Sequence, residues 1–365
     1  MTSIDVYRDR LQRAQVALQP SGLELLCVGP GSDLIYLTGI DAHLSERLNL
    51  LLVPASGRPS FVIPRLEAPN IAGKADLVDI HAWEETESPS ELAAKLAQSA
   101  KSVAVGDQLH AIFLLRLQEA MPTASWTPGG PVLRDLRMRK DAAEIESQRE
   151  VAQRTDRAWA VFLESGPIAG LTEHGAMDRL SGLMAEQGIN PMFGICASGP
   201  NSAAPHHHTG DRVIEAGDAV IFDFGGELDS YLSDMTRTVV IGEPSDEYRK
   251  VYEIVLRANQ AAFEAVKPGV ACEDVDRAAR DLITEAGYGP SFIHRVGHGL
   301  GLDVHEEPYM VCGNTLLLAP GMVFSDEPGI YLEGRFGVRI EDTVVCTGDG
   351  AERLNSAAKD LTVMD

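Results

Sequence analysis

Two acidic residues in the second half of the chain have a spacing that could bind a divalent cation. Asp223 ends the apolar run AVIFDF, and Asp234 begins a stretch that leads into TRTVVIG. A hairpin centred between Leu228 and Asp229 would place the two carboxylates opposite each other, with Cβ atoms about 5 Å apart, where like charges destabilise a sheet. A cation between them would turn that repulsion into binding, so the pattern predicts one wall of a metal site.

A second acidic pair repeats this arrangement. Glu327 and Glu341 flank Glu333-Gly334-Arg335, and their midpoint falls on the glycine. Glycine is favoured where a chain turns back on itself. Either pair alone is more often a solvated surface feature, but two hairpins that each present facing acids favour a metal centre.

A histidine supplies the remaining candidate ligand. His298 lies in the sequence RVGHGLG, where the flanking glycines let the backbone approach closely. A lone histidine is usually not a ligand, but with four carboxylates it completes an oxygen-rich set that suits Mn²⁺, Fe²⁺ or Co²⁺, and Zn²⁺ less specifically. Two divalent ions would balance the four carboxylates, and a bridging hydroxide could then persist near neutral pH.

Other catalytic motifs fail on spacing. The sequence HEEPY at residues 305–309 lacks the second histidine of H-E-x-x-H. Gly29 and Gly31 lack the third glycine of a dinucleotide-binding loop, and the sequence has no G-x-S-x-G motif for a serine nucleophile. The acidic and histidine residues therefore remain the best-supported chemistry.

Composition limits the partners and the compartment. Asp and Glu total 54 against 31 Lys and Arg, for a net charge of −23. The ordinary reading of this charge is solubility, and so acidic a surface repels nucleic acid. Five scattered cysteines without a C-x-x-C pair predict reduced thiols and a cytoplasmic location. The N-terminal sequence lacks signal-peptide features, and no apolar run is long enough to span a membrane, so no membrane partner is expected.

Length and local composition predict two domains. A chain of 365 residues exceeds one ordinary domain, and the breaker cluster TPGGP at 127–131 ends the first one. We place the boundary between Thr127 and Lys140 and assign the domains to 1–134 and 135–365. The first is predicted to be α/β, with helices at Ile4–Leu18 and Ala111–Ala120 and strands at Leu23–Val28, Leu48–Val53, Ser60–Ile63 and Val103–Gly106.

The second domain groups strands around helices, a pattern typical of an α+β sheet domain. Its predicted helices cover Met138–Glu164, Glu173–Gln187, Asp246–Val266 and Cys272–Ala286. Its predicted strands cover Ala219–Phe224, Thr238–Ile241, Met322–Phe324 and Val338–Val345. Ser245 is the expected N-cap of the third of these helices.

Several motifs carry a family resemblance. They are SGPNSA (198–203), PH (205–206), DFG (223–225), SDMTRT (233–238), GHG (297–299), VHE (304–306), EPG (327–329) and VRIED (338–342). Together they resemble the pita-bread metallopeptidases, and among these the Xaa-Pro dipeptidases (prolidases) and aminopeptidase P, strongly over 140–360. Residues 1–134 resemble the creatinase-type N-terminal domain more weakly. The resemblance implies an α+β fold, with a C-terminal pita-bread catalytic domain preceded by a smaller α/β domain.

The resemblance also implies a complete ligand set for two divalent metal ions, with Mn²⁺ preferred and Co²⁺, Fe²⁺ and Zn²⁺ as alternatives. Asp223 would bind one ion, and Asp234 and Glu341 would bridge both. His298 and Glu327 would bind the other ion. Glu327 would also handle the proton of the attacking hydroxide.

Four further residues take substrate roles by the same resemblance. His305 would stabilise the tetrahedral intermediate, and His206 would contact the substrate or the leaving nitrogen. His294 and Arg339 would bind substrate or support the ligands. These roles fit hydrolysis, because a polarised carbonyl needs a donor for its developing oxyanion and a leaving amine needs a proton.

The implied reaction is hydrolysis of the bond that precedes proline in a short peptide. The implied assembly is a homodimer whose N-terminal domain helps to close the partner's cleft. Whether only dipeptides are accepted stays open. Another metal-dependent hydrolase or lyase on the same fold, or a non-enzymatic binding protein, is the alternative. Asp326 stands where the family more often has an apolar residue, and strand alternation is expected to point it away from Glu327.

Three adjacent histidines compete for one role. The histidine of the family follows a small-residue stretch that ends in proline, here Pro205, and this favours His206. If the segment is extended, alternation would place His206 and His208 on one face and turn His207 away.

Overall fold

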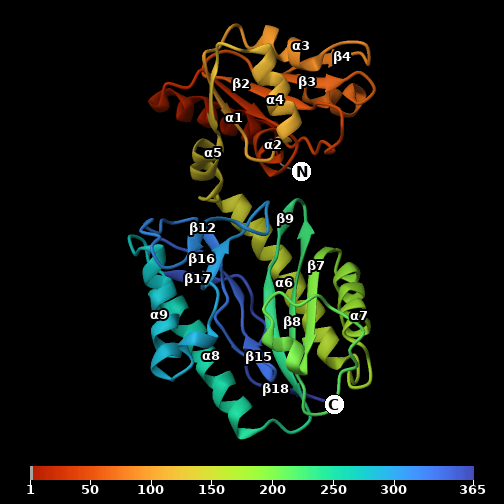
Figure 1. Ribbon diagram of the computed structural model, residues 1–365, viewed down its shortest axis with the longest axis vertical. Helices are drawn as coiled ribbons and strands as arrows, with labels where there is room; N and C mark the ends of the chain where they lie inside the picture. The colour runs from red at the N-terminus through yellow and green to blue at the C-terminus, as the bar shows by residue number, and fades with distance from the viewer. Residues whose placement is uncertain (1–2) are drawn as a thin grey trace. The chain divides into compact units, whose positions relative to one another are not determined.

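The computed structural model describes residues 3–365, and two compact units divide the chain between Arg137 and Met138 (Figure 1). The first unit is built on one six-stranded sheet with the strand order β4-β3-β2-β1-β5-β6. Its strands are β1 (Leu25–Val28), β2 (Leu50–Pro54), β3 (Ser60–Pro64), β4 (Asp79–Trp83), β5 (Ser102–Val105) and β6 (Ser125–Pro128). Strands β3 and β4, β1 and β5, and β5 and β6 run parallel, while β2 is antiparallel to both its neighbours.

The helices of the first unit are α1 (Ile4–Leu18), α2 (Ser32–Thr38), α3 (Pro89–Leu96), α4 (Ala111–Ala120) and α5 (Gly130–Arg137). The predictions for α1 and α4 are confirmed. Helices α2, α3 and α5 and strands β4 and β6 were not predicted from the sequence. Helix α5 begins inside the predicted breaker cluster, because proline is tolerated in the first turn of a helix.

The second unit contains four α-helices and three sheets within the described part of the chain. The helices are α6 (Ala142–Glu164), α7 (Glu173–Glu186), α8 (Asp246–Ala265) and α9 (Cys272–Glu285). Helix α6 begins later than predicted, at a capping box formed by Asp141 and Glu144. The predicted N-cap of α8 is confirmed, since the side chain of Ser245 accepts a hydrogen bond from the backbone N–H of Tyr248.

Two larger sheets carry most strands of the second unit. One has the order β18-β10-β8-β7, with β9 beside β8, and the other has the order β12-β11-β13-β16-β17, while β14 and β15 form a separate hairpin. The strands of the first sheet are β7 (Asn190–Ser198), β8 (Ala219–Leu228), β9 (Tyr231–Leu232), β10 (Met235–Ile241) and β18 (Thr362–Met364). The remaining strands are β11 (Gly297–Gly299), β12 (Glu306–Met310), β13 (Val323–Asp326), β14 (Gly329–Leu332), β15 (Phe336–Arg339), β16 (Asp342–Cys346) and β17 (Ala351–Arg353).

Each helix pair covers one side of these strands (Figure 1). Side chains of α6 and α7 share a core with β8 and β10 that includes Trp159, Phe162 and Phe222. Side chains of α8 and α9 share another core with β13 and β16 that includes Val255 and Phe324. The strands are therefore held between two helical layers, as in the α+β architecture that the sequence predicts. Among the residues that the structure describes, no helix is both long and apolar enough to cross a membrane.

The predicted register of the first acidic hairpin is wrong by two residues. Asp223 pairs with Thr236 rather than with Asp234. The turn lies at Asp229 and Ser230, whose backbone φ angles are 51° and 72°. Its centre is therefore one residue further along the chain than the sequence indicated.

The predicted register of the second acidic hairpin is confirmed. In β14 and β15, Gly329 pairs with Arg339, so the hairpin is centred on Gly334. The predicted continuous strand over Val338–Val345 is wrong, because the chain leaves β15 after Arg339 and joins another sheet at β16. Glu341 lies in this break and forms an isolated bridge with Thr236. The break connects the second hairpin to the first.

Candidate active site

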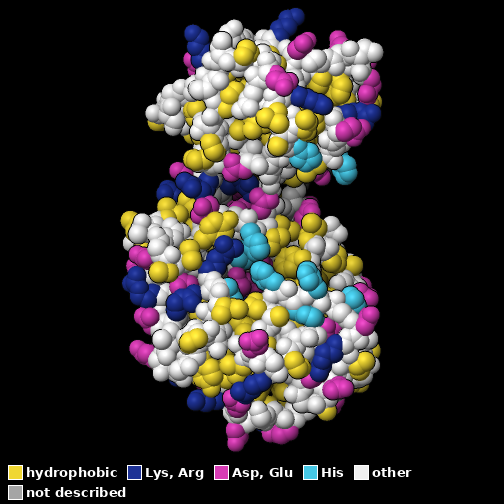
Figure 2. Space-filling model, viewed as in Figure 1, with side chains coloured by type: hydrophobic (Ala, Val, Ile, Leu, Met, Phe, Trp, Pro, Cys, Tyr) yellow, Lys and Arg dark blue, Asp and Glu magenta, His cyan; other side chains and the backbone are white. Residues whose placement is uncertain are grey.

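All nine residues singled out in the sequence line one cavity of about 700 Å³ in the second unit. Figure 2 shows the histidine side chains gathered around a hollow on this face, with acidic side chains inside it. The nine residues are His206, Asp223, Asp234, His294, His298, His305, Glu327, Arg339 and Glu341. The chain thus brings together side chains separated by up to 135 positions in sequence (206 to 341).

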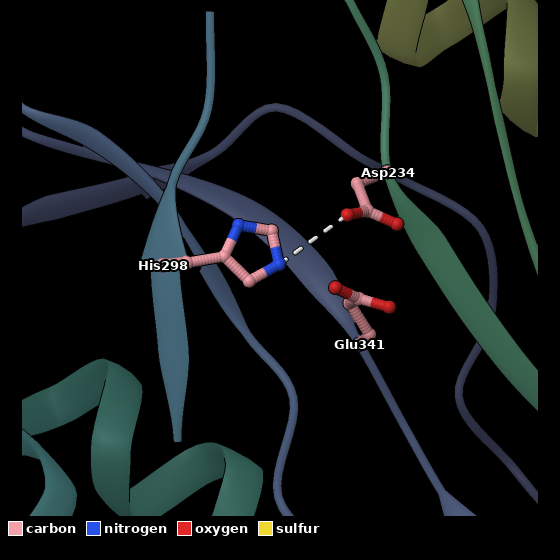
Figure 3. Close-up of side chains that lie close together, drawn as sticks. All are labelled: Asp234, His298 and Glu341. Carbon is pink, nitrogen blue, oxygen red and sulfur yellow. Dashed lines mark ion pairs between the residues drawn. The ribbon is translucent and has the colours of Figure 1, made fainter. Parts of the chain in front are cut away.

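Three of these side chains converge closely enough to share a metal ion (Figure 3). One ligand atom each from Asp234, His298 and Glu341 lies within 4.8 Å of the other two. The Nε2 atom of His298 is 3.5 Å from Oδ2 of Asp234 and 3.4 Å from Oε1 of Glu327. The fourth acid, Asp223, is turned toward Arg339 instead, at 2.5 Å.

Close backbone packing fixes the position of His298. It is the middle residue of β11, which lies between β12 and β13. A Cβ atom on Gly297 would lie 1.8 Å from the carbonyl oxygen of Ser325, and one on Gly299 would lie 2.3 Å from that of Glu307. Only glycine fits at either position, so the GHG motif is required by the contact between strands.

The imidazole of His298 presents a free lone pair to the acids. Its Nδ1 atom lies 3.1 Å from the carbonyl oxygen of Gly299, and a carbonyl can only accept, so Nδ1 carries the proton. Burial lowers the pKa of His298 to about 3, and the neighbouring His305 adds to the effect. The ring is therefore neutral, with Nε2 available as a ligand atom, the form in which histidine binds metals.

The carboxyl groups lack sufficient positive charge nearby. Burial raises the pKa of Asp234 and Glu341 well above the usual carboxyl range, and the neighbouring acids raise it further. Enclosure raises the pKa of Glu327 to about 8, although Arg339 opposes the rise. Among residues 3–365, the one arginine that forms a salt bridge with any of these four acids is Arg339, which pairs with Asp223. A buried set of acids with one neutral imidazole fits divalent cations, which would supply the missing charge.

Arg339 and His294 are linked through Tyr331, a residue that was not predicted to belong to the site. The Nη1 atom of Arg339 donates to the hydroxyl oxygen of Tyr331 at 2.9 Å, and that hydroxyl lies 2.8 Å from Nε2 of His294. Nδ1 of His294 lies 2.7 Å from the carbonyl oxygen of Arg295, so Nε2 accepts from the phenol. Burial, with the charge of Arg339, lowers the pKa of His294 to about 3. A series of side-chain hydrogen bonds therefore connects Asp223 to His294 through Arg339 and Tyr331.

Two hydroxyl groups that were also missed orient predicted ligands. The hydroxyl of Thr236 donates to Oε2 of Glu341 at 2.6 Å. The hydroxyl of Ser325 accepts from the backbone N–H of His298 at 3.1 Å and lies 3.4 Å from Oε1 of Glu327. A local signal existed for Ser325, which lies two residues before the ligand it contacts, Glu327. Thr236 contacts a ligand 105 positions away, so no local signal in the sequence indicated that contact.

Asp326 points away from the cavity, as strand alternation predicts. It pairs across the sheet with Asp342, is 1% exposed, and neither of its carboxyl oxygens has a hydrogen-bond partner. Burial raises its pKa well above the usual carboxyl range, with Arg353 opposing. The neighbouring Asp342 is different, because Arg237 and Lys359 both donate to its carboxylate.

The three adjacent histidines separate by a turn, not by extended alternation. The backbone N–H of His207 donates to the carbonyl of Ala204 at 3.1 Å, so the expected extended segment is wrong. His206 lines the cavity, while His207 turns to Glu173, 2.8 Å away. His208 is exposed and is not part of the cavity wall.

His305 also lines the cavity. Burial and the charge of Arg295 lower the pKa of this histidine.

Known protein families match both parts of the chain. Residues 146–348 match metallopeptidase family M24, and residues 10–139 match the creatinase/prolidase N-terminal domain.

Similar proteins extend over nearly the whole length. A probable dipeptidase PepE of Mycobacterium tuberculosis is 43% identical and aligns with 99% of this chain and 97% of its own. An Xaa-Pro dipeptidase of Lactobacillus helveticus is 35% identical, with 97% and 98% covered. The crystal structure of a prolidase from Thermococcus sibiricus superposes with a TM-score of 0.93 at 39% identity, covering 98% of this chain and 99% of that one.

Proposed function

The chain belongs to metallopeptidase family M24, and from that premise we propose that it hydrolyses the peptide bond preceding proline in short peptides. The observation that carries the proposal is the single cavity lined by all nine predicted residues. The relatives named Xaa-Pro dipeptidase and prolidase support the choice of substrate. We further assign the catalytic domain to 135–365 and the N-terminal domain to 1–134.

We propose that five residues hold two divalent ions, with Mn²⁺ as the first choice. Asp223 would bind one ion, Asp234 and Glu341 would lie between the two, and His298 and Glu327 would bind the second. Bound ions would polarise the scissile carbonyl and make a water molecule more acidic. The spare lone pair of His298 and the clustered acids support this assignment.

Side chains of the protein would carry out the remaining steps by transferring protons and donating hydrogen bonds. The carboxyl of Glu327, 3.4 Å from His298, would take the proton from the attacking water. The neutral imidazole of His305 would donate to the oxyanion that develops on the carbonyl. His206, on the same cavity wall, would contact the leaving nitrogen, which needs a proton.

Arg339 and His294 would orient the reacting groups and contact the substrate. Arg339 already donates to Thr236 and Tyr331 and pairs with Asp223, so its guanidinium is largely engaged. We propose that it fixes Asp223, and that His294 meets the substrate beside it.

Arg295 favours dipeptides over longer substrates. Its guanidinium lies 4.3 Å from the ring centre of Tyr309 and lines the cavity. Among residues 3–365 it forms no salt bridge with a carboxylate. A cation held this way would bind the free carboxylate of a dipeptide.

A substrate panel tests the proposed function. Xaa-Pro dipeptides, matched Xaa-Ala dipeptides, Xaa-Pro tripeptides and Xaa-Pro amides would be assayed with Mn²⁺ and with chelator. We expect metal-dependent cleavage of Xaa-Pro dipeptides and a strong preference for the free acid over the amide. Faster cleavage of Xaa-Ala, or no metal-dependent cleavage, would refute the proposal. Arg295→Leu should remove the preference for the acid while preserving metal binding.

We also propose a homodimer in the cytoplasm. All five cysteines are free, which supports a reducing compartment. The family resemblance supports the dimer. Light scattering that gives a monomer mass for a fully active sample would contradict it.

A further inference from the structure

Glu173 is a buried carboxylate outside the cavity wall that binds one segment of chain at several points. It is the first residue of α7 and its side chain is fully buried. Its Oε1 atom accepts from the backbone N–H and the hydroxyl of Ser198, both at 2.8 Å, and from Nδ2 of Asn201 at 2.9 Å. Its Oε2 atom accepts from the backbone N–H of Gly210 at 3.1 Å and lies 2.8 Å from Nε2 of His207.

All these partners belong to residues 198–210, the segment that carries His206 to the cavity. The contacts lie on both sides of His206 in sequence, with His207 immediately after it. Backbone bonds reinforce them, because the N–H of Glu173 donates to the carbonyl of Arg212 and that of His174 donates to Gly210. These hydrogen bonds together hold the segment against the first turn of α7, and we call them the clamp.

The surroundings favour a charged carboxylate at this place. Burial alone would raise the pKa of Glu173, but hydrogen bonds from Asn201, Ser198 and His207 together lower it. The positive end of the α7 dipole adds to the stabilisation of negative charge. Arg212 extends this network, because it donates to the hydroxyl of Ser198 at 2.7 Å.

We propose that Glu173 is a positioning residue that holds the 198–210 segment so that His206 reaches the scissile bond, with His207 as part of the same clamp. This inference rests on the proposed role of His206 in hydrolysis. Glu173 itself does not line the cavity, so its effect on turnover would pass through His206.

A double-mutant cycle tests this route. Glu173→Gln preserves size but replaces an acceptor oxygen with an NH₂ group that faces donors. It should lower kcat by about tenfold or more, as small displacements of reacting groups do, with a smaller change in KM. In a His206→Ala background the same substitution should change kcat less than about twofold. An equal fold loss in both backgrounds, or no loss in the first, would overturn the proposal.

Variants of the neighbouring histidines provide matched controls. His207→Gln retains a donor toward Glu173 and should keep most activity, whereas His207→Phe should reproduce the loss. His208→Ala should be close to wild type, because His208 is exposed and its side chain forms no hydrogen bond or salt bridge within the described residues. If Glu173→Gln does not fold, the His207 pair carries the test. Loss in His207→Gln equal to that in His207→Phe would refute the hydrogen-bond clamp.

Hydrogen–deuterium exchange separates this inference from the proposed function. Peptides covering 198–210 should exchange faster in Glu173→Gln and His207→Phe than in the wild type, while the metal content should not change. Unchanged exchange would overturn the clamp whatever the activity. A wild-type chain that cleaves no Xaa-Pro peptide would refute the proposed function, and exchange would still report on the clamp.

Discussion

The two hairpins that carry the acidic residues differ in how their turns are built. The β14–β15 hairpin turns at Gly334, with φ of 71°, and follows the register that the sequence predicts. The β8–β9 hairpin turns at Asp229 and Ser230, which adopt positive φ without glycine. Positive φ is costly for residues other than glycine, and Asp is one of the few that tolerate it. A glycine marks the centre of the β14–β15 turn plainly, and no glycine marks the centre of the β8–β9 turn.

The register error left the site intact because it amounts to two residues. Side chains on a strand alternate with a period of two, so a shift of two positions keeps each side chain on its face, whereas a shift of one would reverse it. Asp223 and Asp234 therefore both line the cavity although they are not cross-strand partners. The side on which a residue lies is easier to predict than its partner.

The largest expected effect comes from the two acids, one of each pair, that are proposed to lie between the ions. Asp234→Asn and Glu341→Ala should each reduce peptide hydrolysis to background, because each removes a carboxylate proposed to lie between the ions. Circular dichroism on the same samples should show that Asp234→Asn keeps its fold, since Asn is nearly isosteric. Activity near wild type in either variant would show that the two acids do not play equivalent roles in the site.

Metal content tests each hairpin separately. Elemental analysis after dialysis against Mn²⁺ should give about two ions per wild-type chain. Asp223→Ala and Glu327→Ala should each retain about one ion, because each removes a ligand proposed for a single ion. A wild-type value near zero, with activity retained in chelator, would contradict the metal assignment for both hairpins.

A loop residue should matter less than the strand acids. His206→Ala should lower kcat by about 10², as expected for a lost proton-transfer or transition-state contact. Metal content should not change, since His206 is not a proposed ligand. Steady-state kinetics with His208→Ala as the control would measure the difference. A larger loss in His208→Ala would mean that the wrong histidine has been assigned.

Local patterns predicted helices α1, α4 and α6 to α9 and nine of the residues that line the cavity, but not strands such as β4, β6, β7 and β12. The helical stretches of α1 and α8 and the Ser245 cap are local features, and each is found where the sequence places it. The break at Glu341 could not be predicted, because the change of sheet depends on a bridge to Thr236, far away in sequence. The roles of Tyr331 and Glu173 also depend on distant partners, so only the folded chain reveals them.

The second hairpin should give the metal-free chain a pH-dependent stability. The pKa of Glu327 is raised from 4.5 to about 8, so between these values the folded chain holds a proton that the unfolded chain releases. The stability contributed by the proton on Glu327 is therefore complete below about pH 4.5 and is lost as the pH rises toward 8. Thermal unfolding in chelator should show Tm falling over this range, and Glu327→Gln should flatten the slope. A Tm that rises with pH in chelator, with no change in Glu327→Gln, would contradict the prediction.

The smallest effects should come from the turns, and they should have opposite signs. No atom lies within 4 Å of a Cβ placed on Gly334, so Gly334→Ala meets only backbone strain. It should lower the free energy of unfolding by about 1–2 kcal/mol, the cost of a left-handed conformation. Ser230→Gly removes such strain and should raise the free energy of unfolding by up to about 1 kcal/mol, since the greater freedom of the unfolded chain offsets part of the gain. Urea unfolding of the metal-loaded chain would measure both, and kcat should stay near wild type because neither residue lines the cavity. If both variants lose stability alike, the side chain of Ser230 stabilises the β8–β9 turn. The two turns would then not differ in the way proposed.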